Sequence, residues 1–263
     1  MKKTFVLDWD GTATDNYERS KKILENIVKT LSARYDIDEK RLLNIYDKQK
    51  AKILANDKEY KWIHKGHASS YCEDPLILNN ASLVEILKIL KPEEDISILW
   101  AEILTFFARA YKITAPTYVP QLLEILKYLK EKGEILVVTN SDPQKVSEEL
   151  KIAPFDINVI GHAKKYKITC ELEEIEESMT SKDGRKINLR RGEYYKILRK
   201  FNPLNSYVIG DGFSCDLSLP MALGFNTILV SDFETMQWAK NESSRDKNSM
   251  HIKSLCSLLD TKL

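Results

Sequence analysis

The chain has 263 residues, of which 43% are hydrophobic, and its 40 basic and 39 acidic residues leave a net charge of +1. This hydrophobic fraction supplies a core and argues against global disorder, and the length suits one large domain or a core with a smaller insert. The balanced charge argues against a dedicated nucleic-acid-binding protein, because such proteins are usually markedly basic.

The cysteines and the N-terminal segment suggest a reducing compartment. Four widely spaced cysteines form no Cys-x-x-Cys pair, which indicates neither a zinc site nor a disulfide framework; they are Cys72, Cys170, Cys215 and Cys256. The apolar segment before Asp8 is too short for a signal peptide. The longest apolar stretch, 96–110, contains Glu102 and Arg109 and is not expected to span a membrane. We expect a cytoplasmic protein without a membrane partner, either a monomer or a homodimer.

The first element predicted is a buried strand over residues 4–7, which ends at Asp8 and Asp10. Side chains alternate along a strand, so these two carboxylates point the same way. They repel each other, and a divalent cation is the usual reason for such proximity. The alternative is an ordinary acidic turn after a strand. The longer pattern, completed by Gly11 and Thr12, is rarer than Asp-x-Asp alone.

The next hundred residues, 16–115, have helical periodicity and no convincing strand. Capping-box patterns predict helix starts at Asp15 and Ser82, and apolar residues at helical spacing predict further helices over 42–54 and 96–107. We therefore expect this block to be an all-helical domain inserted after the first strand.

Strands and helices then alternate to the end of the chain, which predicts a doubly wound, Rossmann-like parallel α/β sheet. The expected strands are short apolar runs at 135–138, 157–160, 206–209, 227–230 and 250–252. Helices are expected to begin at Pro120, Asp142 and Ser254, with a short one around Met221. The sheet would form one core from residues 1–15 and 116–263. Ligands of such sheets bind beyond the carboxyl ends of the strands, where Asp8 and Asp10 fall.

The segment 164–190 interrupts this alternation because it is densely charged. Apolar residues alternate on both sides of the turn signal Asp183-Gly184, which predicts a projecting β-hairpin. Such a hairpin could be a solvated surface flap, a lid or a dimer contact.

Two further polar segments follow predicted strands. Thr139, Asn140 and Ser141 would place a hydroxyl and backbone amides at a strand-to-helix junction, where they form a phosphate cradle or an ordinary helix cap. Asp211 and Asp216 follow the 206–209 strand, and the alternative there is an acidic turn. Carboxylates that converge with Asp8 and Asp10 suit a hard cation such as Mg²⁺.

Together these segments resemble the haloacid dehalogenase-like (HAD) superfamily of hydrolases, whose members are mostly magnesium-dependent phosphatases. Asp8-Trp9-Asp10-Gly11-Thr12 resembles the first motif, Thr139-Asn140-Ser141 the second, and Gly210-Asp211 through Asp216, followed by Pro220 to Phe225, the fourth. The resemblance covers nearly the whole chain and implies that 16–115 is a helical cap domain.

The third motif of the superfamily is a lysine or arginine that binds the nucleophile and the phosphate. Many members have Lys-Pro there, and no such pair lies between the second and fourth motifs of this chain. Arg191-Gly192-Glu193 resembles a Lys-Gly-Glu variant, so Arg191 is the residue that the resemblance implies. Arg190 and Lys186 are rivals, and the alternative is that Arg191 is a surface residue.

The resemblance implies a phosphatase that hydrolyses a small phosphorylated metabolite through an aspartyl-phosphate on Asp8. Asp10 would protonate the leaving oxygen and then activate water. Mg²⁺ would bind to Asp8, Asp211, Asp216 and the main-chain carbonyl of Asp10. Thr139, the Asn140 backbone and Arg191 would hold the phosphoryl oxygens.

Other activities remain open on the same chemistry. Dehalogenases of the superfamily lack the second acid, so Asp10 favours phosphoryl transfer. A phosphomutase or phosphotransferase uses the same catalytic groups. Phosphonate cleavage would need a lysine in the cap, such as Lys65. A non-catalytic protein that binds a phosphorylated ligand would tend to lose the acids. A nucleic-acid role for the basic residues of 164–191 is disfavoured, because the intervening glutamates largely cancel their charge.

The helical block offers one candidate for substrate contact, the segment from Trp62 through His64, Lys65 and Gly66 to His67. It combines aromatic rings, a basic residue and a glycine that could act as a hinge. Partly buried or plain surface residues are the alternative.

Overall fold

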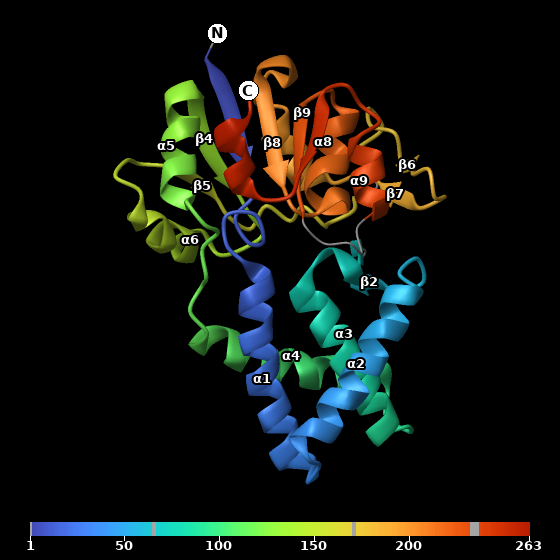
Figure 1. Ribbon diagram of the computed structural model, residues 1–263. Coiled ribbons are helices and arrows are strands. Elements are labelled where there is room, and N and C mark those ends of the chain that lie inside the picture. The colour runs from blue at the N-terminus through green and yellow to red at the C-terminus, as the bar shows by residue number, and fades with distance from the viewer. Residues whose placement is uncertain (1, 65–66, 170–171, 232–236) are drawn as a thin grey trace. The chain divides into compact units, whose positions relative to one another are not determined.

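The computed structural model describes residues 2–64, 67–169, 172–231 and 237–263 (Figure 1). The chain divides into two compact units. The first comprises Met1–Thr14, Trp62–Ser69 and Tyr118–Leu263, and the second comprises Asp15–Lys61 and Ser70–Thr117. Cys170, Lys65 and Gly66 lie outside the described residues, and the side chains of Trp62, His64 and His67 are not described either.

The first unit is built on a six-stranded, fully parallel sheet (Figure 1). Its strands, in spatial order, are β10 (Ser249–Ile252), β9 (Asn226–Val230), β8 (Ser206–Gly210), β1 (Lys3–Leu7), β4 (Gly133–Val138) and β5 (Asn158–Ile160). Each is a strand that the sequence predicts, to within two residues, so the doubly wound, Rossmann-like α/β fold is confirmed. β1 lies inside the sheet, between β4 and β8.

Helices cover both faces of this sheet. Successive side chains of β1 point to opposite faces, so each face contributes apolar residues that a helix can bury. Phe5 and Leu7 of β1 pack with α5 (Leu122–Lys132), α6 (Pro143–Glu149) and η6 (Leu255–Asp260). Val6 packs on the other side with α7 (Gly192–Leu198), α8 (Ser218–Ala222) and α9 (Gln237–Ser243). Burial on both faces explains why the strands are continuous apolar runs.

The helix expected at Pro120 begins instead at Leu122. Gln121 precedes it with a φ of 57°, in the left-handed region that favours glycine. The helix expected at Asp142 is α6, and Asp142 caps it by accepting from the backbone amides of Gln144 and Lys145.

The charged insert after β5 contains a hairpin, but a shorter one than the sequence predicts. Its strands are β6 (Ser178–Thr180) and β7 (Lys186–Asn188), joined through Gly184 with a φ of +84°. The alternation predicted for the first half of the segment is not a strand among the described residues. Instead, Leu172 and Ile175 are buried in the core with Ile187 and Leu189 of the second half.

The insert also docks on α9, through its turn. The Lys182 backbone amide donates to Glu242 Oε1 at 2.6 Å, and the Arg185 guanidinium lies 4.5 Å from the ring centroid of Trp238. Its buried apolar residues and these contacts show that the insert is packed structure rather than a solvated flap.

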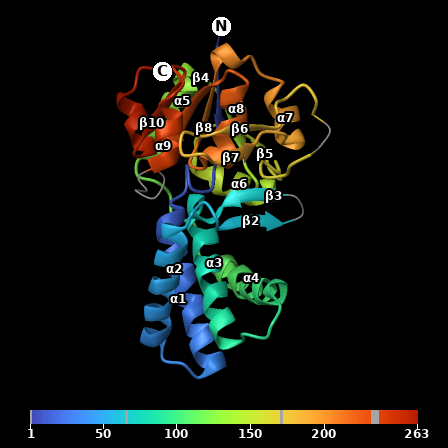
Figure 2. The same ribbon diagram turned by 90° about the vertical axis from the view of Figure 1, so that its right-hand side faces the viewer.

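The second unit is a bundle of four helices with its own apolar core. The helices are α1 (Asn16–Tyr35), α2 (Glu39–Ala55), α3 (Pro75–Leu90) and α4 (Ile96–Ile113). α1, α2 and α3 pack side by side, and α4 contacts α1 and α3 (Figure 2). Asp15 caps α1 by accepting from the Glu18 amide, as its capping-box pattern predicts.

The start expected at Ser82 is wrong. α3 begins seven residues earlier, where Asp74 caps it and Pro75 is its first residue. Ser82 lies inside the helix, and its hydroxyl donates to the carbonyl of Leu78, one turn earlier. A capping pattern in a continuous apolar helix is therefore not enough to place a helix start.

Residues 16–115 are also not free of strands. β2 (Lys61–His64) and β3 (His67–Ser70) form a two-stranded sheet, and most of this pair belongs to the first unit. The run is too short and too polar to give a readable period-2 pattern. None of the described helices is long and apolar enough to span a membrane.

Candidate active site

The register of the sheet brings the predicted residues to one edge. Leu7 pairs with Val137 of β4 and with Ile209 of β8, so all three strands end at the same level. Asp8 and Thr139 follow the first two of these strands, and Asp211 follows the third. The Asp8 amide continues the ladder by donating to the Ile209 carbonyl at 2.9 Å.

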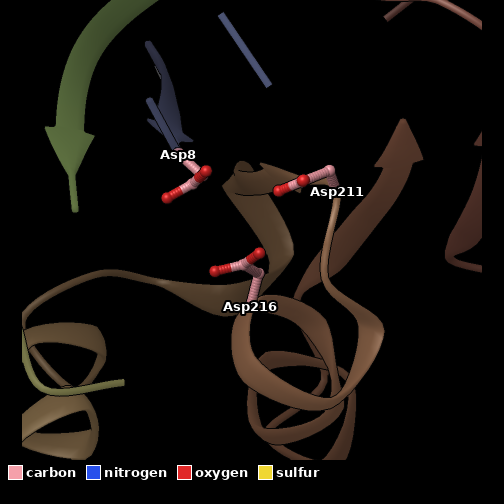
Figure 3. Close-up of side chains that lie close together, drawn as sticks. All are labelled: Asp8, Asp211 and Asp216. Atoms are coloured by element: carbon pink, nitrogen blue, oxygen red, sulfur yellow. The ribbon is translucent and has the colours of Figure 1, made fainter. Parts of the chain in front are cut away.

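Three carboxylates meet at this edge. One oxygen each of Asp8, Asp211 and Asp216 lies within 4.8 Å of the others, and the three side chains point toward one another (Figure 3). Thr12 links two of them, because its hydroxyl lies 3.1 Å from Asp8 Oδ2 and 3.3 Å from Asp211 Oδ1. Asp8 and Asp216 are buried.

Two glycines allow the carboxylates to approach the backbone so closely. A Cβ at Gly11 would lie 2.1 Å from Asp211 Oδ2, and Gly11 also has a φ of +94°. A Cβ at Gly210 would lie 2.6 Å from the Cβ of Asp216. No side chain could replace either glycine without displacing an acid.

A lysine that the sequence analysis did not select lies among these acids. The Lys165 ammonium is 2.5 Å from Asp8 Oδ1 and 2.7 Å from Asp216 Oδ1, and the side chain is almost fully buried. Burial alone lowers the pKa of a lysine, but Asp216 and Asp8 outweigh it and hold the pKa of Lys165 well above its usual range. Lys165 is therefore charged at neutral pH.

Burial has the opposite effect on Asp8. It raises the pKa of this carboxyl to about 7, against the lowering effect of Lys165 and with a further increase from Asp216. Burial also raises the pKa of Tyr194, whose hydroxyl donates to the Asp216 carbonyl at 2.9 Å. Asp8 is thus sensitive to any additional positive charge at this edge.

The main chain of Lys165 is held from both sides. Its amide donates to Asn140 Oδ1 at 2.8 Å, and its carbonyl accepts from Arg191 Nη1 at 2.9 Å. Arg191 is buried and also donates through Nε to the Asn188 carbonyl. We call these contacts the Lys165 clamp. Arg191 and the Asn140 side chain therefore both form hydrogen bonds to the main chain of the protein itself.

The structure therefore does not bring Arg191 to Asp8 as the sequence analysis expects, because both hydrogen-bonding groups described for its guanidinium point at main-chain carbonyls. The rivals Arg190 and Lys186 have other partners: Arg190 Nε donates to the Ile175 carbonyl, and Lys186 is exposed near Glu177. The surface alternative for Arg191 is wrong, since its side chain is buried.

One signal in the sequence could have identified Lys165. It lies five residues beyond β5, the strand next to β4, so it follows the carboxyl end of a strand as the acids do. The loop that carries it is anchored to the loop after β4: His162 and Ala163 donate to the carbonyls of Ser141 and Thr139.

Asp10 points to different partners from those of Asp8. Its Oδ2 accepts from the Thr139 hydroxyl at 3.2 Å, and its Oδ1 lies 3.3 Å from Lys145 Nζ. The Thr139 hydroxyl also accepts from the Ser141 amide at 3.1 Å. The second acid is therefore held beside the predicted phosphate cradle.

The carboxylate cluster fits a divalent cation. Asp8, Asp211 and Asp216, when ionised, carry three negative charges against the single positive charge of Lys165, so the four groups have a net charge of −2. Their donors are all oxygen, which Mg²⁺ prefers. The main-chain carbonyl of Asp10 stays a prediction as a further ligand.

Comparison with known proteins relates the chain to one fold. No protein-family model matches the sequence, and no curated protein matches it. Similar solved structures include the magnesium-bound putative HAD-hydrolase YfnB of Bacillus subtilis, with a TM-score of 0.53. A predicted phosphoglycolate phosphatase from Haemophilus somnus gives 0.52, and L-2-haloacid dehalogenase of Xanthobacter autotrophicus gives 0.50.

Each of these three is 15% identical to this chain and aligns over 98% of it and 97% of its own length. Identity at this level shows the fold and leaves the reaction open, since one fold hosts several chemistries. The chain has the fold of the HAD-like hydrolases.

Proposed function

We propose that the chain is a magnesium-dependent phosphatase that hydrolyses a small phosphorylated metabolite through an aspartyl-phosphate on Asp8. The observation that carries the proposal is the arrangement of two acids at one strand end. Asp8 lies in the carboxylate cluster beside Lys165, and Asp10 lies beside Thr139. This arrangement separates a nucleophile from an acid/base.

In the first step an oxygen of Asp8 attacks phosphorus, and the bond from phosphorus to the ester oxygen breaks. Asp10 donates its proton to that leaving oxygen. Lys165 stabilises the ionised nucleophile and the developing charge on the phosphoryl oxygens. The Thr139 hydroxyl and the amides of the loop after β4 bind those oxygens.

In the second step Asp10 takes a proton from water, which attacks the aspartyl-phosphate and releases phosphate. Mg²⁺ held by Asp8, Asp211 and Asp216 would supply charge neutralisation for the transferring phosphoryl group. The helical unit would act as the cap, and its role in substrate choice is part of the proposal.

Asp10 also favours phosphoryl transfer over dehalogenation, although a similar structure is a haloacid dehalogenase. A halide leaves without a proton, so a dehalogenase has no use for a second acid. In this chain the second acid is present and held by hydrogen bonds.

The test is magnesium-dependent release of phosphate from an aryl phosphate and from a panel of sugar phosphates, nucleotides and phosphoglycolate. We expect turnover that a chelator abolishes. Asp8→Asn and Asp10→Asn should lose it while circular dichroism shows that they remain folded. No turnover by the wild type across the panel would instead favour a non-catalytic phospho-ligand-binding protein.

A further inference from the structure

Lys145 is a charged residue at the candidate site to which the mechanism above gives no role. It lies on α6, and its Nζ is 3.3 Å from Asp10 Oδ1. The Thr139 hydroxyl donates a hydrogen bond to the other oxygen of the same carboxyl, Asp10 Oδ2, at 3.2 Å. The two contacts come from consecutive elements, the end of β4 and the helix that follows it, so they restrain the Asp10 side chain from two directions.

Lys145 is itself held in place by a second acid on the same helix. Glu149 lies one turn further along α6, with its Oε1 3.7 Å from Lys145 Nζ. Its Oε2 accepts from the Trp9 indole N–H at 2.6 Å. A lysine has high rotamer entropy, and a nearby carboxylate that is itself fixed limits the positions of its ammonium.

The series of contacts begins and ends at neighbouring residues. Trp9 is fully buried and packs edge-on against Tyr118, whose hydroxyl donates to the main-chain carbonyl of Glu149. From the Trp9 indole the contacts run through Glu149 and Lys145 to the carboxyl of Asp10. Trp9 is thus the rigid end of a side-chain network that ends at Asp10, its neighbour in the sequence.

Exposure also distinguishes the members of this network. The side chains of Glu149 and Asp10 are 10% and 20% exposed, and that of Lys145 is 28% exposed. Partly desolvated ion pairs lose less to solvent screening than fully exposed pairs do. Such a pair can fix one side-chain rotamer near solvent.

We infer that Lys145 is a positioning residue for Asp10, held in place by Glu149 and Trp9. It keeps the Asp10 carboxyl in the rotamer that contacts Thr139, at the place where the leaving oxygen of the substrate departs. This inference rests on the proposed function, because it assigns Lys145 to the proton transfer from Asp10 to that oxygen.

The dependence of the rate on the leaving group isolates this role. An alkoxide is a poor leaving group and needs the proton from Asp10, whereas 4-nitrophenolate leaves well without it. The value of kcat/KM reports the first phosphoryl transfer, in which the ester oxygen departs. We would measure kcat/KM for 4-nitrophenyl phosphate and for glycerol phosphate with wild type, Lys145→Met, Lys145→Arg and Glu149→Gln.

For Lys145→Met we expect kcat/KM for glycerol phosphate to fall about 10- to 100-fold, and for 4-nitrophenyl phosphate by less than about threefold. Lys145→Arg should restore most of the loss, and Glu149→Gln should show the same pattern with a smaller amplitude.

Lys151→Met is the matched control, since Lys151 lies just beyond α6 with a side chain that is 69% exposed; it should behave as wild type. Equal losses for both substrates, a rise in KM alone, or no loss would overturn the inference and leave the proposed function intact. Absence of turnover by the wild type on these two substrates and across the panel above would overturn both.

Discussion

Asp8 and Asp10 are two residues apart, and each has a lysine beside it, but the two pairs are built differently. Lys165 is almost fully buried between Asp8 and Asp216, and its main chain is held by the Lys165 clamp. The Lys145 ammonium is partly exposed and lies beside the carboxyls of Asp10 and Glu149. The first pair is fixed by the fold, whereas the second depends on side-chain rotamers.

This difference suits the roles proposed for the two acids. A nucleophile and metal ligand must keep one position, and a buried lysine fixed through its backbone supplies a constant charge there. An acid/base must exchange protons with the substrate and with water, so it benefits from partial exposure. The pair of Asp8 with Lys165 and the pair of Asp10 with Lys145 therefore differ in how deeply they are buried, although the two aspartates are only two residues apart.

The largest expected effect is the loss of the buried lysine. Lys165→Met leaves Asp8 and Asp216 buried without their cation, and we expect the free energy of unfolding without metal to fall by about 3 to 5 kcal/mol. Added Mg²⁺ should restore part of this stability, because it replaces the lost positive charge. Denaturant unfolding with and without Mg²⁺ measures both effects; an unchanged midpoint would contradict the buried ion pairs.

The next largest effect concerns the Lys165 clamp. Arg191→Met removes this donor from the buried carbonyl of Lys165 and from the partly buried carbonyl of Asn188, and we expect the free energy of unfolding to fall by about 2 to 4 kcal/mol. Arg199→Met, at an exposed position, is the control and should change stability by less than about 0.5 kcal/mol. If Arg191 instead binds substrate phosphate, its loss should raise KM while the midpoint of unfolding stays unchanged.

The raised pKa of Asp8 predicts a pH-dependent affinity for Mg²⁺. Burial raises this pKa to about 7, so below pH 7 a proton must leave before the carboxylate can bind the metal. We expect the affinity to increase about tenfold per pH unit up to pH 7 and then to level off. Isothermal titration calorimetry between pH 5.5 and 8.5 would measure it, and a flat profile would refute the competition between proton and metal.

The raised pKa of Asp8 also affects the stability of the metal-free protein, and this contribution decreases, rather than increases, as the pH rises. Because the folded-state pKa lies above the usual value of 3.8, the Asp8 contribution to stability is fully present below about pH 4. It is lost as the pH rises through about 7. Asp8→Asn should remove this part of the pH dependence of unfolding.

The smallest expected effect lies at the partly exposed pair. Lys145→Met should lower the free energy of unfolding by about 1 kcal/mol or less, since Lys145 and Asp10 both retain contact with water. Its effect on stability should therefore be well below that of Lys165→Met. Comparable losses in thermal or denaturant unfolding would show that the two pairs do not differ as described.

Local patterns predicted most of the fold. The four inner strands of the sheet are short, largely apolar runs that are mostly buried, and such runs are visible in the sequence without any knowledge of their neighbours. The cap of α1 at Asp15 and the start of α6 after Asp142 depend on side chains within three residues of the backbone that they bind. These features are local, so a sequence pattern describes them.

The errors occurred where longer-range packing decided the structure. Ser82 has a capping pattern, but it lies in a helix that Asp74 and Pro75 had already begun. The 164–190 insert shows alternating apolar residues, yet Leu172 and Ile175 pack into the core outside the hairpin strands. A pattern of period 2 indicates which residues are buried and does not establish that they pair as strands.

The candidate site divides in the same way. The sequence alone placed Asp8, Thr139 and Asp211 at strand ends, because each directly follows an apolar run and parallel strands end at one edge. The apolar runs and their flanking acids did not single out the basic partner of Asp8, although Lys165 also follows the end of a strand. Lys165 is 157 positions away and is one of several neighbouring basic residues, and only the packing of the insert buries its ammonium between two carboxylates.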